Sequence, residues 1–120
     1  MKEKRISDQA IHFILSRKNE ELKDLTGLEI ARNIGTNQAE LSRSFKIDYN
    51  ITLSVFVKRE KIYRALSILD RDHEKSIDEL AKELGFLKVE DFIMEFRRQA
   101  AIEPQKYREL RKKAKPAKQA

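Results

Sequence analysis

The feature that most constrains how this chain can fold is an internal repeat. Residues 79–85, Glu-Leu-Ala-Lys-Glu-Leu-Gly, match residues 29–35, Glu-Ile-Ala-Arg-Asn-Ile-Gly, at an offset of 50. One residue, which we place at Phe86, is then inserted, and large apolar residues continue to match at an offset of 51. The matched pairs are Leu41 with Phe92, Phe45 with Phe96, and Phe56 with Tyr107. A repeat of this period predicts that one supersecondary unit is used twice.

The first copy has the pattern of two short helices joined at a glycine. Apolar residues recur at helical spacing over residues 28–34, and Gly35 then ends the run. Asn37 restarts the pattern, and its apolar face continues at Leu41 and Phe45. This pattern fits a helix-turn-helix, whose second helix lies in a DNA groove, and it also fits a plain helical hairpin.

Helix-start signals recur together with the repeat. Thr26 and Ser76 are each followed three residues later by a glutamate, which is the pattern of a capping box. Asn37 with Glu40 resembles a further box at the start of the second helix of the first copy. Because these signals recur, they favour two helix-turn-helix units over one accidental hairpin.

The composition predicts an all-α fold. Only three glycines and two prolines interrupt the chain, and no strand-like alternation stands out. No apolar run approaches the roughly 20 residues that a bilayer-spanning helix needs, which argues against a membrane partner. The absence of cysteine excludes disulfides and thiolate chemistry and is compatible with the cytoplasm, which we expect as the location.

Catalysis is not expected, nor is a metal or a cofactor. The sequence has no paired-histidine site and no Gly-rich phosphate loop. The adjacent carboxylates Glu90 and Asp91 are explained by pairing with the helix dipole in the first turn of a helix. We therefore predict that the chain is not an enzyme.

The net charge of +6 is distributed unevenly. Residues 105–120 carry a net charge of +6, residues 28–64 carry +3, and residues 76–104 carry −3. The first copy and the C-terminal segment can therefore neutralise DNA phosphates, whereas the second copy as a whole cannot. We expect residues 112–120 to form a basic tail, disordered beyond Pro116, that adds affinity without sequence preference.

Start and stop signals place the remaining helices. Ser7 is expected to cap a helix over residues 8–17, followed by a polar connection at residues 18–25. Thr52 is expected to cap a long helix over residues 53–69, whose apolar positions change phase midway, as if its ends packed on different helix pairs. Further helices are expected at residues 77–84, at residues 89–101, and from Pro104 onward with Tyr107 and Leu110 facing inward.

The candidate recognition helix covers residues 38–48. Leu41 and Phe45 face the core, which leaves an outer face of mostly polar residues. Glutamine can pair with adenine and arginine with guanine O6 and N7, and alanine can touch a thymine methyl group, so this face suits a major groove. An ordinary solvated helix face has the same composition. The outer residues are Gln38, Ala39, Ser42, Arg43 and Lys46.

The residues singled out so far resemble the DNA-binding domain of AraC/XylS-type transcription regulators. The resemblance runs from about Ile6 to Arg111, and it rests on many ordered positions rather than on one short motif. These positions are Leu-Ser-Arg-Ser-Phe-Lys at 41–46, Ile62, Ala65 and Leu69, Ser-Ile-Asp-Glu-Leu-Ala at 76–81, Gly85-Phe86, Phe92, Phe96-Arg97, Pro104 and Tyr107-Arg108.

The resemblance implies about seven helices in two helix-turn-helix subdomains, at residues 6–52 and 70–111, joined by a central helix at 53–69. In that family the two recognition helices enter successive major grooves, so a site with two half-elements about 10 base pairs apart is expected. Lys58, Arg59, Arg64 and Arg97 either contact phosphates or only solvate their helices. The base-contacting residues implied by position are Asn37, Gln38, Ala39, Ser42 and Arg43 in the first unit and Lys88, Val89, Glu90, Ile93 and Met94 in the second.

Two positions depart from the family pattern. Asn50 stands where members usually have glycine, and asparagine tolerates the left-handed conformation expected there. Met94 stands opposite Arg43 in the repeat, with Glu90 and Asp91 beside it. We therefore expect the first unit to hold most of the specificity and the second to dock through backbone contacts and shape.

The prediction is a sequence-specific DNA-binding module of a bacterial-type transcription regulator, with double-stranded DNA as its partner. The rival is a protein-interaction module whose second helix-turn-helix contacts RNA polymerase or another protein. Many family members carry an effector-sensing domain ahead of this module. The residues before Thr26 have room for one helix only, so the sequence fits either a stand-alone regulator or a piece of a longer one.

Overall fold

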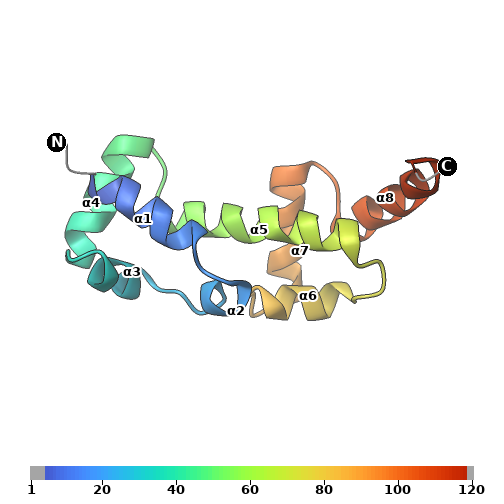
Figure 1. Cartoon of the computed structure of the whole chain (residues 1–120), viewed down its shortest axis with the longest axis horizontal. Coiled ribbons are helices and arrows are strands. Elements are labelled where there is room, and N and C mark those ends of the chain that lie inside the picture. The colour runs from blue at the N-terminus through green and yellow to red at the C-terminus, as the bar shows by residue number, and fades with distance from the viewer. Residues whose placement is uncertain (1–4, 119–120) are drawn as a thin grey trace. The chain divides into compact units, whose positions relative to one another are not determined.

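The computed structural model describes residues 5–118, with side chains as far as residue 113, and this part of the chain is all-α as predicted. It holds eight helices rather than about seven (Figure 1). They are α1 Ile6–Leu15, α2 Asn19–Leu22, α3 Gly27–Asn33, α4 Gln38–Tyr49, α5 Leu53–Arg71, α6 Ile77–Glu83, α7 Val89–Ala100 and α8 Pro104–Lys118.

The chain divides into two compact units between residues 60 and 61, inside α5. The first unit has its own core, in which α1, α3, α4 and the beginning of α5 pack together. Leu53 is buried there, and Phe56 and Val57 pack against the same cluster, so the first half of α5 belongs to this core. Its largest buried side chains are Ile14, Leu22, Ile30, Leu41 and Phe45.

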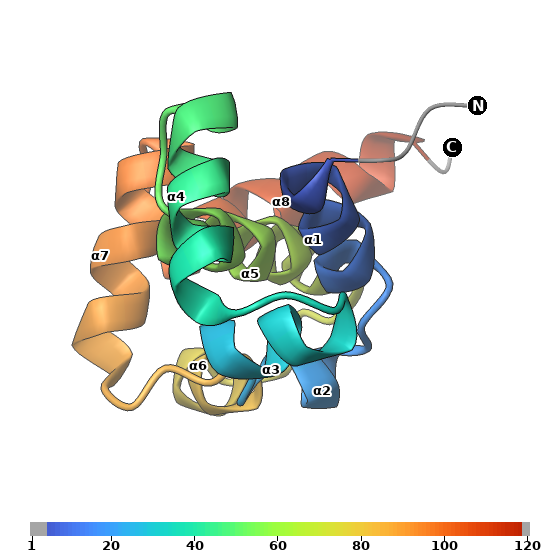
Figure 2. The ribbon, with the colours of Figure 1, turned by 90° about the vertical axis from the view of Figure 1, so that its left-hand side faces the viewer.

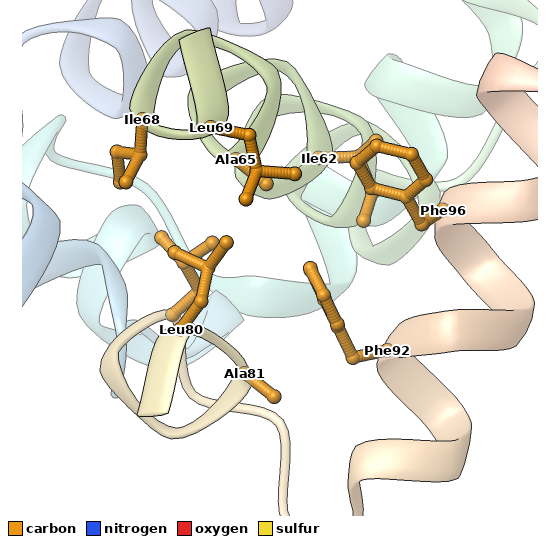
Figure 3. Close-up of a cluster of buried hydrophobic side chains, with 9 residues drawn as sticks. Ile62, Ala65, Ile68, Leu69, Leu80, Ala81, Phe92 and Phe96 are labelled. Atoms are coloured by element: carbon orange, nitrogen blue, oxygen red, sulfur yellow. The ribbon is translucent and has the colours of Figure 1, made fainter. Parts of the chain in front are cut away.

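The second unit has a separate core built on the other half of α5 (Figure 3). Ile62, Ala65, Ile68 and Leu69 meet buried side chains of α6 and α7. Because α5 contributes to one core before residue 60 and to the other after it, the predicted phase change along this helix is confirmed. The facing residues are Leu80, Ala81 and Leu84 of α6 and Phe92 and Phe96 of α7.

The repeat extends to the backbone of both turns. Gly35 and Gly85 have φ angles of 81° and 88°, a left-handed conformation that glycine adopts without steric cost. The amide of Thr36 donates to the carbonyl of Ala31 at 2.9 Å, and Phe86 donates to Ala81 at 2.9 Å. Both turns therefore end their first helix in the same way.

The position of the inserted residue was predicted wrongly. Phe86 is the backbone equivalent of Thr36 at the offset of 50, whereas the N-cap residues Asn37 and Lys88 are already 51 apart. The extra residue is therefore Leu87, whose side chain is 99% exposed. Phe86 packs against the second core, so the chain accommodates the insertion at the exposed Leu87 instead.

The predicted helix caps are mostly confirmed. The capping boxes of Thr26 with Glu29 and of Ser76 with Glu79 have both of their hydrogen bonds. Thr52 Oγ1 accepts from the amide of Val55 at 3.1 Å. Asn37 accepts from the amide of Glu40 at 2.8 Å, but the Glu40 carboxylate bonds to Arg43 and Ser44, so this cap is a half box.

Four local predictions at the ends of the chain and in its connections need correction. Ser7 is not a cap, because α1 begins at Ile6 and the Ser7 side chain is fully buried. Residues 18–25 contain the short helix α2, since Leu22 reaches the core. The tail predicted to be disordered beyond Pro116 is instead helical as far as Lys118, where α8 ends. Residues 119–120 lie outside the described part. Leu110 is half exposed rather than inward-facing.

Both long helices of the repeat end on a non-glycine residue in the left-handed conformation. Asn50 caps α4 with φ 59°, as predicted, and Ala101 caps α7 with φ 63° at the equivalent position. Asparagine adopts this conformation readily, whereas for alanine the clash of Cβ with the carbonyl oxygen costs about 1–2 kcal/mol. The second unit therefore stores strain that the first does not.

Replacing Ala101 by glycine is expected to stabilise the protein. Glycine removes the steric cost of the left-handed conformation, and its greater freedom in the unfolded chain offsets part of that gain. The free energy of unfolding of Ala101→Gly should rise by about 0.5–1 kcal/mol in urea titrations. Asn50→Gly is the matched control and should change stability less. An equal effect at the two positions would contradict the strain at Ala101.

Candidate nucleic-acid interface

Helix α4 turns the predicted polar face outward. Leu41 and Phe45 are fully buried, and because they lie one helical turn apart they fix the rotation of α4 about its own axis. In Figure 2, α4 stands upright after the short turn that follows α3. The six predicted residues are all exposed, and so are Ile47 and Tyr49 near the end of α4; the six are Asn37, Gln38, Ala39, Ser42, Arg43 and Lys46.

The C-terminal end of α4 is tied to the start of α1. The buried Ser7 hydroxyl donates to Asp48, and the Tyr49 hydroxyl donates to Asp8. That bond to the Asp8 carboxylate raises the pKa of Tyr49, since it stabilises the protonated phenol. Arg5 forms ion pairs with Asp8 at 3.2 Å and with Asp48 at 3.6 Å. The sequence did not predict this tie, which sets where α4 sits on the unit.

A carboxylate on the same helix holds the guanidinium of Arg43. Arg43 forms an ion pair with Glu40, and the hydroxyl of Ser44 donates to the other oxygen of Glu40 at 3.4 Å. From the sequence, Glu40 was expected only to cap the helix. Its spacing of three residues from Arg43 was a signal that such a pair can form on a helix surface.

Gly27 leaves space for Gln38 at the start of α4. A Cβ atom placed on Gly27 would lie 3.0 Å from the Gln38 side-chain nitrogen. Any larger residue at 27 would push this flexible side chain aside. Gly27 was not singled out in the sequence, because its importance depends on the approach of α3 to α4.

The outward face of α7 has a different chemistry. Lys88, Glu90 and Met94 are exposed, as predicted for base-contacting residues. Val89 and Ile93 are only half exposed because they pack against the second core. Four of these five residues thus lie on α7 and Lys88 is its N-cap residue, and two of the five also serve the core.

The predicted phosphate contacts lie on α5 and α7. Lys58 and Arg59 are exposed, whereas Arg64 is half buried. Arg97, the repeat equivalent of Lys46, forms an ion pair with Glu103 at 3.2 Å. An exposed ion pair of this kind contributes little to stability, so Arg97 can exchange its partner at small cost.

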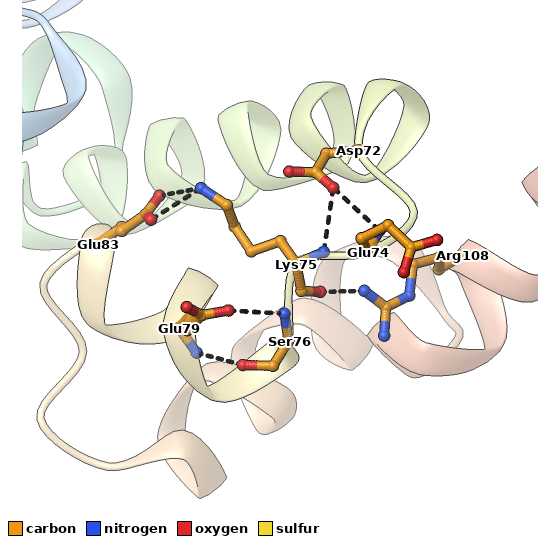
Figure 4. A network of polar contacts seen from close by, with 7 residues as sticks. All are labelled: Asp72, Glu74, Lys75, Ser76, Glu79, Glu83 and Arg108. Atoms are coloured by element: carbon orange, nitrogen blue, oxygen red, sulfur yellow. Dashed lines mark hydrogen bonds and ion pairs between the residues drawn. The ribbon is translucent and has the colours of Figure 1, made fainter.

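Polar contacts fix the approach to α6 and the start of α8 (Figure 4). The guanidinium of Arg108 donates to the carbonyl of Lys75, whose ammonium pairs with Glu83 at 2.7 Å. Asp72 accepts from the amides of Glu74 at 2.9 Å and Lys75 at 3.0 Å. These bonds stabilise the charged carboxylate and so lower the pKa of Asp72.

Features of a metal site and of a membrane span are both absent from the described residues. Among residues 5–118, no group of three or more His, Cys, Asp or Glu side chains is placed to hold a metal ion. No helix in the same part of the chain is both long enough and apolar enough to cross a membrane.

Residues 30–110 match a family model described as a helix-turn-helix domain, which covers both units of the repeat. The chain belongs to the AraC-type helix-turn-helix family. Domains of this family are DNA-binding parts of transcription regulators, and the AraC-type resemblance predicted from the sequence is confirmed.

One relative agrees with the helix-turn-helix assignment. The chain is 31% identical over 109 residues to YtdP, an HTH-type transcriptional regulator of Bacillus subtilis (strain 168). That match covers 91% of this chain but only 14% of the length of YtdP.

Solved structures share the AraC-type fold. A transcriptional regulator from Chromobacterium violaceum with an AraC-type DNA-binding domain is 24% identical, with a TM-score of 0.78 and coverage of 92% of this chain and 94% of that one. The DNA-binding domain of AdpA, solved in complex with a target DNA, is 18% identical, with a TM-score of 0.76 and coverage of 94% and 98%.

A hydrogen bond between α8 and α5 of this AraC-type domain is expected to be lost at alkaline pH. The Tyr107 hydroxyl donates to Asp70 at 2.9 Å, and burial together with this bond raises the pKa of Tyr107 above its ordinary value of 10.0. The stabilisation is therefore complete below pH 10 and is lost as the pH rises through the higher pKa of the folded state.

Tyr107→Phe removes the hydroxyl and keeps the ring contact with Phe96 at 6.0 Å between centroids. At pH 8 it should lower the free energy of unfolding by about 1 kcal/mol, the worth of one hydrogen bond. Urea titrations at increasing pH should show the difference from the wild type shrinking above pH 10. A difference that stays constant to pH 11 would show that the hydroxyl is not responsible.

Proposed function

We propose that this AraC-type domain binds double-stranded DNA sequence-specifically by inserting α4 into the major groove. The observation that carries the proposal is the outward face of α4. Six predicted residues of this face are exposed, and burial of Leu41 and Phe45 fixes the rotation of the helix. Polar, small and basic side chains of this kind match the donor, acceptor and methyl groups of the major-groove edges.

Arg43 is the leading base-contacting residue in this proposal. It lies in the middle of the exposed face, and its guanidinium can donate two parallel hydrogen bonds to guanine O6 and N7. Gln38 and Asn37 at the start of α4 supply amides suited to adenine. Lys46 lies about one helical turn after Arg43. Together with Lys58 and Arg59 on α5, it supplies positive charge for phosphates.

Glu40 sets how freely Arg43 contacts DNA. Its carboxylate neutralises Arg43 in the free protein and repels phosphates, so it weakens attraction to DNA of any sequence. The same ion pair limits the orientations of the guanidinium. We propose that Glu40 favours binding at guanine over binding elsewhere, because only a good bidentate contact compensates for its charge.

Arg43→Ala should weaken binding to the preferred site and relax selection at one guanine. The lost bidentate contact should cost about 1–3 kcal/mol of binding free energy on that site and much less on random DNA. Lys46→Ala is the control, because loss of a phosphate contact weakens all sequences alike. Sequence selection from a random DNA pool and titration of the selected site measure both effects. An unchanged guanine preference in folded Arg43→Ala would exclude Arg43 from this role.

Glu40→Gln and Asp91→Asn form a matched pair, because Asp91 is the repeat equivalent of Glu40. Three residues after Glu40 stands Arg43, whereas three residues after Asp91 stands Met94. Each change removes one negative charge near DNA and should raise affinity for random DNA by up to about fivefold at 0.15 M salt. Only Glu40→Gln should also lower the preference for guanine, by about twofold, the size of a surface ion pair. The same change of preference in both variants would argue against a specific effect on Arg43.

A further inference from the structure

The two recognition helices present opposite chemistry from equivalent positions. Three residues of the α4 face, Gln38, Ser42 and Arg43, are polar. Their equivalents on α7, which are Val89, Ile93 and Met94, are all apolar. The turns before both helices share their glycine conformation and their closing hydrogen bond, so these residues occupy the same places within their units.

Apolar side chains at the start of α7 are exposed to water. Met94 is 50% exposed, and Leu87, immediately before the N-cap residue, is 99% exposed. Val89 and Ile93 pack one side against the second core and leave the other side half exposed. Met94 and Leu87 can therefore reach a ligand, whereas the core holds Val89 and Ile93 in place.

The thymine C5-methyl group is the apolar feature of the base edges in the major groove. Because α7 carries apolar residues where α4 carries hydrogen-bonding ones, we infer that α7 recognises thymine methyl groups through Met94 and Leu87. This inference rests on the proposed function, since it requires that the chain binds duplex DNA. It gives the second unit a sequence preference of its own, which adds to docking by backbone contacts and shape.

Basic residues flank this face and can reach DNA phosphates, whereas its acidic residues lower any general attraction to DNA. Lys88 and Arg97, the equivalents of Asn37 and Lys46, lie at the start and in the last turn of α7, where they can contact phosphates. Glu90 and Asp91 oppose general attraction to phosphates. Binding by α7 must then depend on the base edges, and an apolar contact to a methyl group needs no charge.

The size of the effect follows from the area of one methyl group. Burying one such group changes an equilibrium about fourfold. Thymine should thus be preferred over uracil by about this factor at each contacted position. Replacing thymine by deoxyuridine removes the methyl group and leaves the hydrogen-bonding edge intact, so it isolates the contact.

The test begins with the site that the full chain selects from random DNA. Each thymine of that site is replaced in turn by deoxyuridine, and affinity is measured for the wild type, Leu87→Ala and Met94→Ala. Leu15→Ala is the control, because the Leu15 side chain on α1 is as exposed as that of Met94 (50%). Arg43→Ala serves to separate the part of the site that α4 contacts.

Replacing one or more of the thymines should lower the affinity of the wild type for the site about fourfold. Leu87→Ala or Met94→Ala should abolish this difference between thymine and deoxyuridine. Leu15→Ala and Arg43→Ala should keep it. The inference would be overturned, with the proposed function left standing, if every thymine were insensitive or if every sensitive thymine stayed sensitive in both α7 variants. A cytosine that loses its preference in Glu90→Gln, with no sensitive thymine, would also overturn it. If no sequence were selected at all, the proposed function itself would fail.

Discussion

The recognition helices depend on the burial of two large apolar side chains one helical turn apart. Leu41 and Phe45 on α4, and Phe92 and Phe96 on α7, are fully buried in their own units. Each pair fixes the rotation of its helix, so the opposite face is presented to solvent whatever residues it carries. Loss of such an aromatic side chain would cost about 3–5 kcal/mol, far more than any single change on the outward face. The cores thereby allow the two outward faces to diverge while the fold is kept.

The divergence is chemical rather than architectural. Both units have a capping box, a left-handed glycine in the turn and a left-handed non-glycine residue after the long helix. The first unit carries Arg43, which is paired with Glu40, whereas the second carries Met94 at the equivalent position. A domain built in this way can combine one strong contact to guanine with weaker contacts to methyl groups.

The sequence predicted the parts of the fold that depend on local rules. The capping boxes, the turn glycines, the buried pairs on α4 and α7, and the phase change in α5 all follow from residue type and spacing. Leu22 escaped prediction because one apolar residue among charged ones gives no periodicity. Ser7 was misassigned because its partner, Asp48, lies 41 residues away and shows only in three dimensions. The inserted residue could not be placed by spacing alone, since Phe86 and Leu87 are both apolar and only packing distinguishes them.

The same limit applies to the interface. The exposed residues of α4 were predicted correctly, because the buried face determines the outward one. The partner of Arg43 was missed, because Glu40 had a competing use as a capping residue. Val89 and Ile93 were expected to face the groove, and their share in the second core followed only from the structure.

The central claim is that α4 lies in the major groove with Arg43 on a guanine. Methylation of guanine N7 blocks that edge, so interference by N7 methylation on the selected site tests the claim most directly. The account predicts that one methylated guanine prevents binding of the wild type, and that this interference disappears with Arg43→Ala. Binding that tolerates methylation at every guanine, or interference that is unchanged in Arg43→Ala, would contradict it.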